Sequence, residues 1–276
     1  MGTLFLIATP IGNLEDISTR ALRILNEVNL IAAEDTRRTR KLLTHFDIHT
    51  PITSYFEHNK LIKLEEIKST LNGGNVALVS DAGTPVINDP GYELVLAVIE
   101  AGYDVSPVPG PCAPIAALTA SGLPADKFIY MGYLPRKSSQ RKSVIEGIKN
   151  LPYSLVFLES PHRLRDSLSE MNNVLGNRKV AVARELTKLH EEIYRGKLED
   201  ALQYFSAQAP RGEFTLVVSG KETSKECWSE ERLKSEIENY LKRDESPSNV
   251  AAILAESSGI PRRKIYNMII STKDDA

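Results

Sequence analysis

Short apolar runs alternate with helix-patterned segments from the start of the chain, and this alternation constrains the fold more than any other feature. Residues 3–8 and 30–33 are apolar runs of strand length. The segment between them places Leu22, Leu25 and Val28 on one side of a helix that begins near residue 18. Strands that alternate with amphipathic helices are typical of α/β layering, so we expect an α/β fold.

The same alternation continues to about residue 120. We expect helices over about 59–71, 92–100 and 115–120, and strands over 76–79 and 103–108. Gly73 and Gly74 end the first of these helices, because glycine is favoured just past a helix C-terminus. These residues therefore predict a first α/β domain over residues 1–122.

The regular alternation of strand and helix patterns is interrupted around residues 123–137, where we place a domain junction. We expect further strands at 128–133, 154–158, 179–183, 191–195 and 213–218, with helices at 163–174 and 198–207. The close spacing of the later strands predicts mixed or antiparallel pairing. A polar linker at 221–228 precedes three helical patterns at 230–243, 246–257 and 261–270. We therefore predict a second α/β domain over residues 123–222 and a small helical domain over 229–276.

One loop of the first domain has the character of a ligand-binding loop. Residues 80–91 read SDAGTPVINDPG and directly follow the apolar strand that ends at Val79. A connection between a strand and a helix needs two to six residues, and open α/β sheets bind small molecules at the carboxyl ends of their strands. Two further loops, residues 9–13 and 109–114, follow other strands. Three such loops together predict a ligand cleft.

Composition and missing motifs exclude several classes of protein. The chain contains no GxG and no GxxxxGK[ST], which removes the dinucleotide fingerprint, the common Rossmann methyltransferase loop and the P-loop. Two cysteines and five histidines show no metal-ligand spacing, so we expect no metal and a reducing, cytoplasmic location. The apolar N-terminus is too short to span a bilayer, and we expect no membrane segment. The formal charge of −2 means that any nucleic acid must meet local basic patches.

Seven segments in order resemble one known family. They are ATPIGNL (8–14), AAEDTRRT (32–39), SDAGTPVINDPG (80–91), PGPCA (109–113), SGLP (121–124), ESPHR (159–163) and ARELTK (183–188). Together they resemble the branch of the tetrapyrrole-methylase-like, class III methyltransferases that acts on small-subunit ribosomal RNA. The resemblance implies two α/β domains with S-adenosylmethionine in the cleft between them, a homodimer, and a small helical tail domain. It also implies 2′-O-methylation of a cytidine ribose in the decoding region of 16S ribosomal RNA within the small ribosomal subunit.

The resemblance also implies where the cofactor binds. Gly83 and Thr84 fall within the loop that touches the cofactor in this family, and small side chains beside them permit a ligand to approach the main chain closely. The expected cofactor-binding residues are Pro10, Ala82, Gly83, Thr84, Ile87, Cys112, Ala113 and Leu158. Cys112 also fits the role of a small buried apolar residue.

Methyl transfer to a ribose oxygen needs close positioning and benefits from a group that takes the hydroxyl proton. Asp81, Glu159 and Glu185 are the candidate proton acceptors, and Lys188 is a candidate to stabilise the forming alkoxide. The sequence does not choose among them.

Basic residues form two tracts that can meet RNA phosphates. Arg37, Arg38, Arg40 and Lys41 follow one another along an expected helix, while Arg136 and Lys137 lie at the domain junction. Arg163 is added because it follows a strand end of the second domain. An exposed, solvated helix face is the alternative explanation for the first tract.

Two other functions remain open from sequence. A tetrapyrrole methyltransferase of the same fold group would act on a small molecule. A non-enzymatic regulator would bind nucleic acid through residues 229–271 alone. The loops of the first domain argue against the regulator, because they are of the ligand-binding type.

Overall fold

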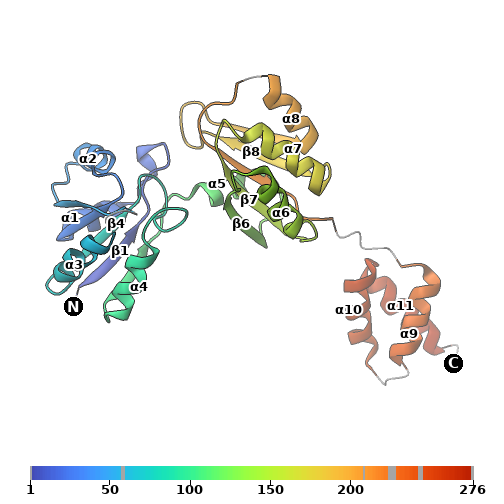
Figure 1. The fold of residues 1–276 in the computed structure, drawn as a ribbon. Coiled ribbons are helices and arrows are strands. Elements are labelled where there is room, and N and C mark those ends of the chain that lie inside the picture. The colour runs from blue at the N-terminus through green and yellow to red at the C-terminus, as the bar shows by residue number, and fades with distance from the viewer. Residues whose placement is uncertain (1, 57–59, 208, 223–227, 242–244, 275–276) are drawn as a thin grey trace. The chain divides into compact units, whose positions relative to one another are not determined.

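The computed structural model describes residues 2–56, 60–207, 209–222, 228–241 and 245–274. The chain divides into two compact units, residues 1–221 and 222–276 (Figure 1). The first unit contains two β-sheets with their helices, and the second unit is helical. The predicted α/β fold with an additional helical domain is therefore confirmed.

The first sheet is entirely parallel. Its strands lie in the order β3 (Ile52–Ser54), β2 (Leu30–Ala33), β4 (Val76–Val79), β1 (Thr3–Ile7) and β5 (Asp104–Val108). Every residue of β2 and β4 is buried, as expected for parallel strands that are covered on both faces. Because the strands run in one direction, the loops after β1, β4 and β5 leave from the same edge, here called the carboxyl edge of the first sheet.

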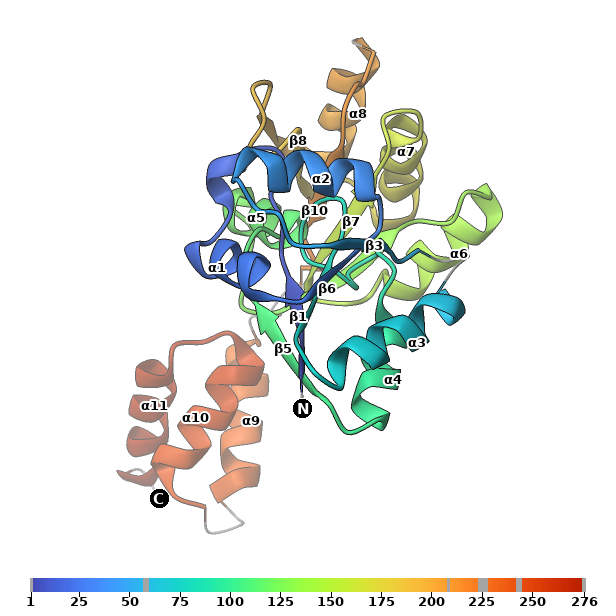
Figure 2. The same cartoon turned by 90° about the vertical axis from the view of Figure 1, so that its left-hand side faces the viewer.

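Two helices cover each face of this sheet. Helices α1 (Thr19–Glu27) and α2 (Thr36–His45) share a core with Ile7 and Val79, whereas α3 (Lys60–Leu71) and α4 (Tyr92–Glu100) share one with Leu4 and Leu78. Figure 2 shows α3 and α4 side by side. Helix α1 begins where predicted, because the Ser18 side chain accepts a hydrogen bond from the amide of Ala21 at 3.1 Å. A short 3-10 turn, η1 (Leu14–Asp16), precedes α1.

The second sheet has mixed strand directions. Its order is β6 (Phe128–Tyr133), β7 (Ser154–Glu159), β10 (Phe214–Val218), β8 (Lys179–Arg184) and β9 (Glu192–Lys197). Among the described strands of this sheet, β6 and β7 alone pair in parallel, and the other pairs are antiparallel. The prediction of mixed pairing is confirmed. The pairing brings the ends of β6, β7 and β8 and the start of β10 to one edge.

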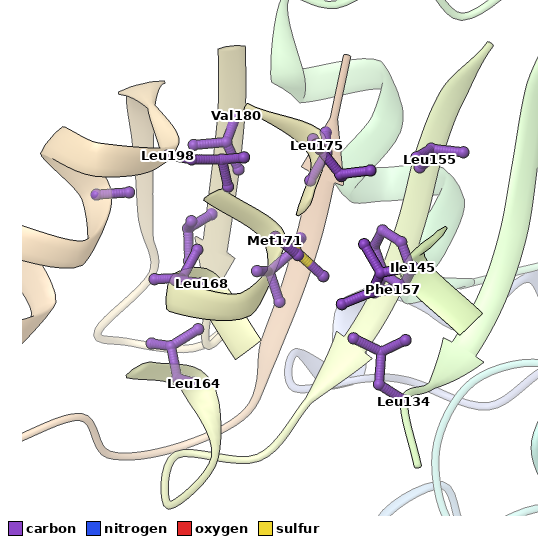
Figure 3. Packing of buried hydrophobic residues seen from close by; sticks show 14 of the residues in the cluster. Leu134, Ile145, Leu155, Phe157, Leu164, Leu168, Met171, Leu175, Val180 and Leu198 are labelled. Carbon is purple, nitrogen blue, oxygen red and sulfur yellow. The ribbon is translucent and has the colours of Figure 1, made fainter. Parts of the chain in front are cut away.

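Helices α6 (Ser138–Ile148), α7 (Leu164–Leu175) and α8 (Leu198–Ala207) cover one face of the second sheet. Figure 3 shows their core, in which Met171 of α7 lies between Leu168 of the same helix and Phe157 of β7. Helix α5 (Ala113–Ser121) covers the other face, with Leu118 against Val156 and Val217. Helix α5 thus packs on the second sheet, although the predicted boundary after residue 122 groups it with the first.

The second unit packs three helices, α9 (Glu230–Leu241), α10 (Pro247–Ser258) and α11 (Arg262–Asp274), around Leu233, Leu254 and Ile265. Ser246 begins α10 as its N-cap, and Gly259 ends it with φ of 70°. The end of the first expected helix, residues 242 and 243, and most of the predicted linker lie outside the described residues. Within the described part of the chain, no helix combines the length and hydropathy needed to cross a membrane.

Replacing Leu168 by Ala should lower the free energy of unfolding of the first unit by about 3 kcal/mol, because a fully buried Leu leaves a cavity when it is truncated. Urea denaturation followed by circular dichroism measures this change. Leu189→Ala is the matched control, since Leu189 is 93% exposed and its loss should change stability by less than about 0.5 kcal/mol. Equal effects of the two substitutions would contradict the packing described here.

Candidate functional site

Three loops are hydrogen-bonded together at the carboxyl edge of the first sheet. Thr9 and Gly83 exchange two backbone hydrogen bonds, at 2.9 and 3.0 Å, which join the loop after β1 to the loop after β4. The Thr84 hydroxyl donates to the carbonyl of Pro111 at 3.0 Å and adds the loop after β5. The three loops expected at strand ends therefore do converge.

The loop after β4 holds an unusual backbone conformation. Gly83 has φ of 83°, in the left-handed region that glycine occupies without strain. Val86 and Asn88 also have positive φ, of 75° and 64°. A β-branched residue in this region is a backbone outlier, and such strain is found most often at binding and catalytic sites. The conformation of this loop therefore indicates a binding or catalytic role in addition to the connection of β4 to α4.

A cavity of about 270 Å³ opens between these loops and the edge of the second sheet formed by β6, β7 and β10. This volume lies just below the range of about 300–1,000 Å³ that is usual for small-molecule sites. Nine of the residues predicted from sequence line it: Arg38, Asp81, Ala82, Gly83, Thr84, Ile87, Cys112, Ala113 and Leu158. Pro10 is not among the lining residues, although its neighbour Ile11 is.

One wall of the cavity is acidic. Asp81 pairs with Arg38 at 3.2 Å, and its other carboxylate oxygen accepts the amide of Asp35 at 3.1 Å. Glu34 accepts the Asp81 amide at 3.4 Å, and Asp89 also lines the cavity. Glu34 and Asp89 lie within the segments that carry the family resemblance, but no role was predicted for either residue. Among the described residues, no group of His, Cys, Asp or Glu forms a metal site.

Burial raises the pKa of the Asp89 carboxyl group to about 6, which is well above the usual value for aspartate and close to neutral pH. A hydrogen bond from Ser80 acts in the opposite direction, and the charges of Glu34 and Asp81 add to the rise. Burial is also the largest cause of the raised pKa of Glu34. Asp89 and Glu34 therefore hold their protons more tightly than they would in water.

The second domain supplies an aromatic wall. The Tyr130 hydroxyl donates a hydrogen bond of 2.6 Å to the Asn88 side-chain carbonyl, and Tyr133, which is 52% exposed, also lines the cavity. Burial raises the pKa of Tyr130 to about 12, so this hydroxyl stays protonated. Gly132 has φ of 62°, and a β-carbon there would lie 2.7 Å from the Asn88 amide nitrogen. Glycine at this bulge therefore lets β6 approach the loop after β4.

Two predicted residues hold the second domain together instead of lining the cavity. Glu159 is 2% exposed; its carboxylate accepts the Ser167 hydroxyl at 2.5 Å and the Ser160 amide at 2.8 Å. Arg163 donates to the carbonyl of Leu134 at 2.5 Å, which fixes the chain after β6. Local sequence does not reveal these contacts, because the partners lie eight and 29 residues away.

Glu185 and Lys188 form an ionic cluster beside the cavity. The Lys188 amine lies 2.9 Å from Glu185 and 2.8 Å from Glu213, which lines the cavity. Burial would raise the pKa of Glu185, but hydrogen bonds from Lys188 and from the Glu213 amide outweigh burial and lower this pKa. Thr187 accepts the Asn13 amide at 3.1 Å, so the loop that carries this cluster contacts the loop after β1. Neither Glu185 nor Lys188 lines the cavity itself.

Apart from Arg38 and the partly buried Arg163, the basic residues predicted to contact RNA occupy two exposed surfaces outside the cavity. Arg37, Arg40 and Lys41 line a shallow groove on α2. The Arg37 guanidinium forms two hydrogen bonds to the carboxylate of Asp35, the N-cap of α2, which holds the pKa of Asp35 well below its usual range. Arg136 and Lys137 are exposed before α6.

The Asp89 carboxyl should titrate with a midpoint near pH 6, which carboxyl-carbon NMR across a pH series measures. Ser80→Ala should raise this midpoint further, because it removes a hydrogen bond that favours the charged form. Glu34→Gln should lower the midpoint, because it removes a neighbouring negative charge. A wild-type midpoint at or below about 4, the value of an ordinary aspartate, would contradict the environment described.

The family described as Tetrapyrrole (Corrin/Porphyrin) Methylases matches residues 3–202. A relative from Halalkalibacterium halodurans, Ribosomal RNA small subunit methyltransferase I, is 47% identical over 97% of this chain and 94% of its own length. A Synechocystis protein of the same name is 44% identical over the whole of both chains. A Thermotoga maritima protein of that name is 48% identical over its entire length, which corresponds to 80% of this chain.

Solved structures show the same fold at low sequence identity. A diphthine synthase matches with a TM-score of 0.62 at 14% identity, covering 80% of this chain and 90% of its own. Uroporphyrin-III-C-methyltransferase from Thermus thermophilus matches with a TM-score of 0.53 at 23% identity, over 79% of this chain and 94% of its own. The matches in sequence and in fold agree with the ordered motifs and the loop-lined cavity. The chain belongs to the tetrapyrrole methylase family, in the group formed by the relatives called Ribosomal RNA small subunit methyltransferase I.

Proposed function

We propose that this protein transfers a methyl group from S-adenosylmethionine to the 2′-oxygen of a cytidine ribose in the decoding region of 16S ribosomal RNA. The observation that carries the proposal is the 47% identity to a small-subunit ribosomal RNA methyltransferase over 94% of that relative's length. The cavity also supports the proposal, because several of its lining residues belong to the segments 80–91 and 109–113, which carry the family resemblance. Likeness to the uroporphyrin enzyme at 23% identity concerns the fold alone and does not favour a tetrapyrrole substrate.

The cavity residues fit S-adenosylmethionine in their chemistry. Ala82, Gly83 and Ala113 leave the backbone accessible, which suits the polar ends of the cofactor. Ile87 and Leu158 offer apolar contact for an adenine ring. The acidic wall suits a ligand with ribose hydroxyls, an amino group and a positively charged sulfur. These residues are therefore the proposed cofactor-binding set.

The cofactor, when bound, supplies a methyl group on a positively charged sulfur, which an oxygen nucleophile can attack in line. The protein's part is to hold the ribose hydroxyl close to that methyl group and to keep water out of the cavity. The hydroxyl is a weak acid, so a side chain that takes its proton as the new bond forms accelerates the step.

Asp89 is the proton acceptor that we favour. Asp81 already receives Arg38 and the Asp35 amide, and Glu159 is buried against Ser167. Lys188 is paired with Glu185 and Glu213, outside the cavity lining. Asp89 lines the cavity and has a pKa of about 6, near the value at which a general base is most effective at neutral pH.

The substrate RNA must present an unstacked nucleotide to the cavity, which favours a single-stranded segment or a junction. The basic surface of α2 lies next in sequence to Arg38, which lines the cavity. We therefore assign phosphate contacts to Arg40 and Lys41, whereas the Arg37 guanidinium is held by Asp35. Arg136 and Lys137 are a second proposed contact with RNA.

The test is transfer of radiolabelled methyl from S-adenosylmethionine to unmodified small ribosomal subunits, with nuclease digestion to identify the product. We expect 2′-O-methylcytidine. Label in another nucleoside, or none in RNA despite measurable cofactor binding, would overturn the assigned substrate.

The same assay tests Asp89. Asp89→Asn should lower kcat by roughly 100-fold, as for loss of a positioned proton acceptor. The wild-type rate should rise with pH around pH 6 as Asp89 ionises, and the variant should lack this rise. Asp126→Asn, which changes an exposed aspartate outside the cavity, is the control. A wild-type pH profile in Asp89→Asn would exclude Asp89 as the acceptor.

Gly83→Leu should weaken binding of S-adenosylmethionine by at least about tenfold, a loss of about 1.4 kcal/mol, because it adds a side chain beside the cavity. Gly102→Leu is the matched control, since Gly102 has φ of 81° against 83° at Gly83 and open space around it. Both substitutions carry a similar backbone strain of about 1–2 kcal/mol. Titration calorimetry measures the affinity, and equal affinities of the two variants would argue against the site.

A further inference from the structure

Another concave surface lies away from the cavity and from the groove on α2, on the face of the second sheet that α5 covers. It is a groove of about 410 Å³ formed by the C-terminal end of α5, the start of β8 and the end of β9, here called the basic groove. Its charged side chains are Lys179, Arg195 and Lys197, and no acidic residue is among the described residues that line it. None of these three residues was assigned a role from sequence.

The three cations converge because of strand register. Lys179 of β8 pairs directly with Lys197 of β9, and Arg195 pairs with Ala181 two positions along. Side chains two residues apart on a strand point to the same face, so all three basic side chains lie on the face that α5 covers. Like charges placed directly opposite in an antiparallel pair repel each other, so this arrangement destabilises the free protein.

Contacts within the protein account for the position of the Arg195 side chain but not for the positions of Lys179 and Lys197. The Arg195 guanidinium donates to the carbonyl of Ala120 at 2.6 and 3.1 Å, which caps the C-terminal end of α5. Among the described residues, no hydrogen bond or ion pair is found for the amines of Lys179 and Lys197. A bound anion would relieve their repulsion.

Helix α5 connects the basic groove to the cavity. Its N-terminal residues Ala113 and Pro114 line the cavity, and Ser121 at its C-terminal end lines the basic groove. Ala113 and Ser121 are eight residues apart, so the two surfaces lie about 12 Å apart along the helix at 1.5 Å per residue. Leu158 and Thr215, which line the cavity, lie on the same sheet face by strand alternation.

We propose that the basic groove binds the phosphodiester backbone of the substrate RNA beside the nucleotide that is modified. The inference rests on the proposed function, since it takes an RNA strand as the substrate. A nucleotide held in the cavity is continuous with its neighbours, and a strand that follows α5 brings phosphates to Lys179 and Lys197. Lysine amines suit this role because they act as charges without sequence preference and position the strand through its backbone.

The test compares Lys179→Gln/Lys197→Gln with Lys149→Gln/Lys221→Gln. Lys149 and Lys221 are exposed lysines of the same domain that do not line the basic groove, so both double variants lose the same charge. Arg195 is retained because it caps α5. The measurements are methyl transfer to small ribosomal subunits, the salt dependence of RNA binding, and cofactor affinity.

We expect the groove variant to raise the KM for subunits about tenfold at moderate salt, with kcat and cofactor affinity unchanged. Its plot of log affinity against log salt should be shallower by about 1.4, which is 0.7 for each lost phosphate contact to a single strand. The control variant should match wild type in every measurement.

The outcomes separate this inference from the proposed function. Wild-type methylation of RNA together with a groove variant that keeps the wild-type KM and salt slope would overturn the groove assignment alone. Failure of wild type to methylate RNA would overturn the proposed function and the groove's assigned ligand together. A lower kcat or weaker cofactor binding in the groove variant would show damage transmitted through α5 and would also count against phosphate binding.

Discussion

The pair of backbone hydrogen bonds between Thr9 and Gly83 is the constraint on which the site depends. Each residue follows a strand of the first sheet, and the pair joins loops that are otherwise 74 residues apart in the chain. Two backbone amides and two carbonyls are satisfied at once, in a region where unpaired groups would be costly. The positive φ of Gly83 makes this geometry accessible, and the strained residues that follow are held between this clasp and the start of α4.

The hydrogen bonds between Thr9 and Gly83 bring side chains that are far apart in sequence to one cavity. The loop after β4 turns Asn88 toward the second sheet, where Tyr130 donates to it, and turns Asp89 toward Ser80 and Glu34. The acidic wall therefore comes from the first domain and the aromatic wall from the second. The raised pKa of Asp89 is a consequence of this closure, because burial is its largest cause.

Much of the fold and the loop framework could be predicted from sequence. Apolar runs such as residues 76–79 and glycine and proline in the loops are local signals. They identified the three converging loops and the strands other than β3, whose three residues are too short a run to give such a signal. Asp89 was missed because its position in the cavity depends on the conformation of Val86 and Asn88, which no local pattern encodes. Glu34 was missed because it reaches the cavity through the pairing of β2 with β4, which joins segments far apart in the sequence. Glu159 was placed at a strand end correctly, but its contact with Ser167, eight residues further on, decides that it is buried.

Helix α5 also bears on the order in which the protein is made. It follows β5 directly, yet its apolar residues Ala117 and Leu118 pack on strands β7, β8 and β10, which are synthesised later. During synthesis the completed first sheet therefore carries a helix whose partner does not yet exist. The apolar face of that helix stays exposed to water, or in a transient contact, until about 100 further residues have been synthesised at roughly 5–20 residues per second. The two sheets are thus linked in folding as well as in the site, since neither reaches its final surroundings without the other.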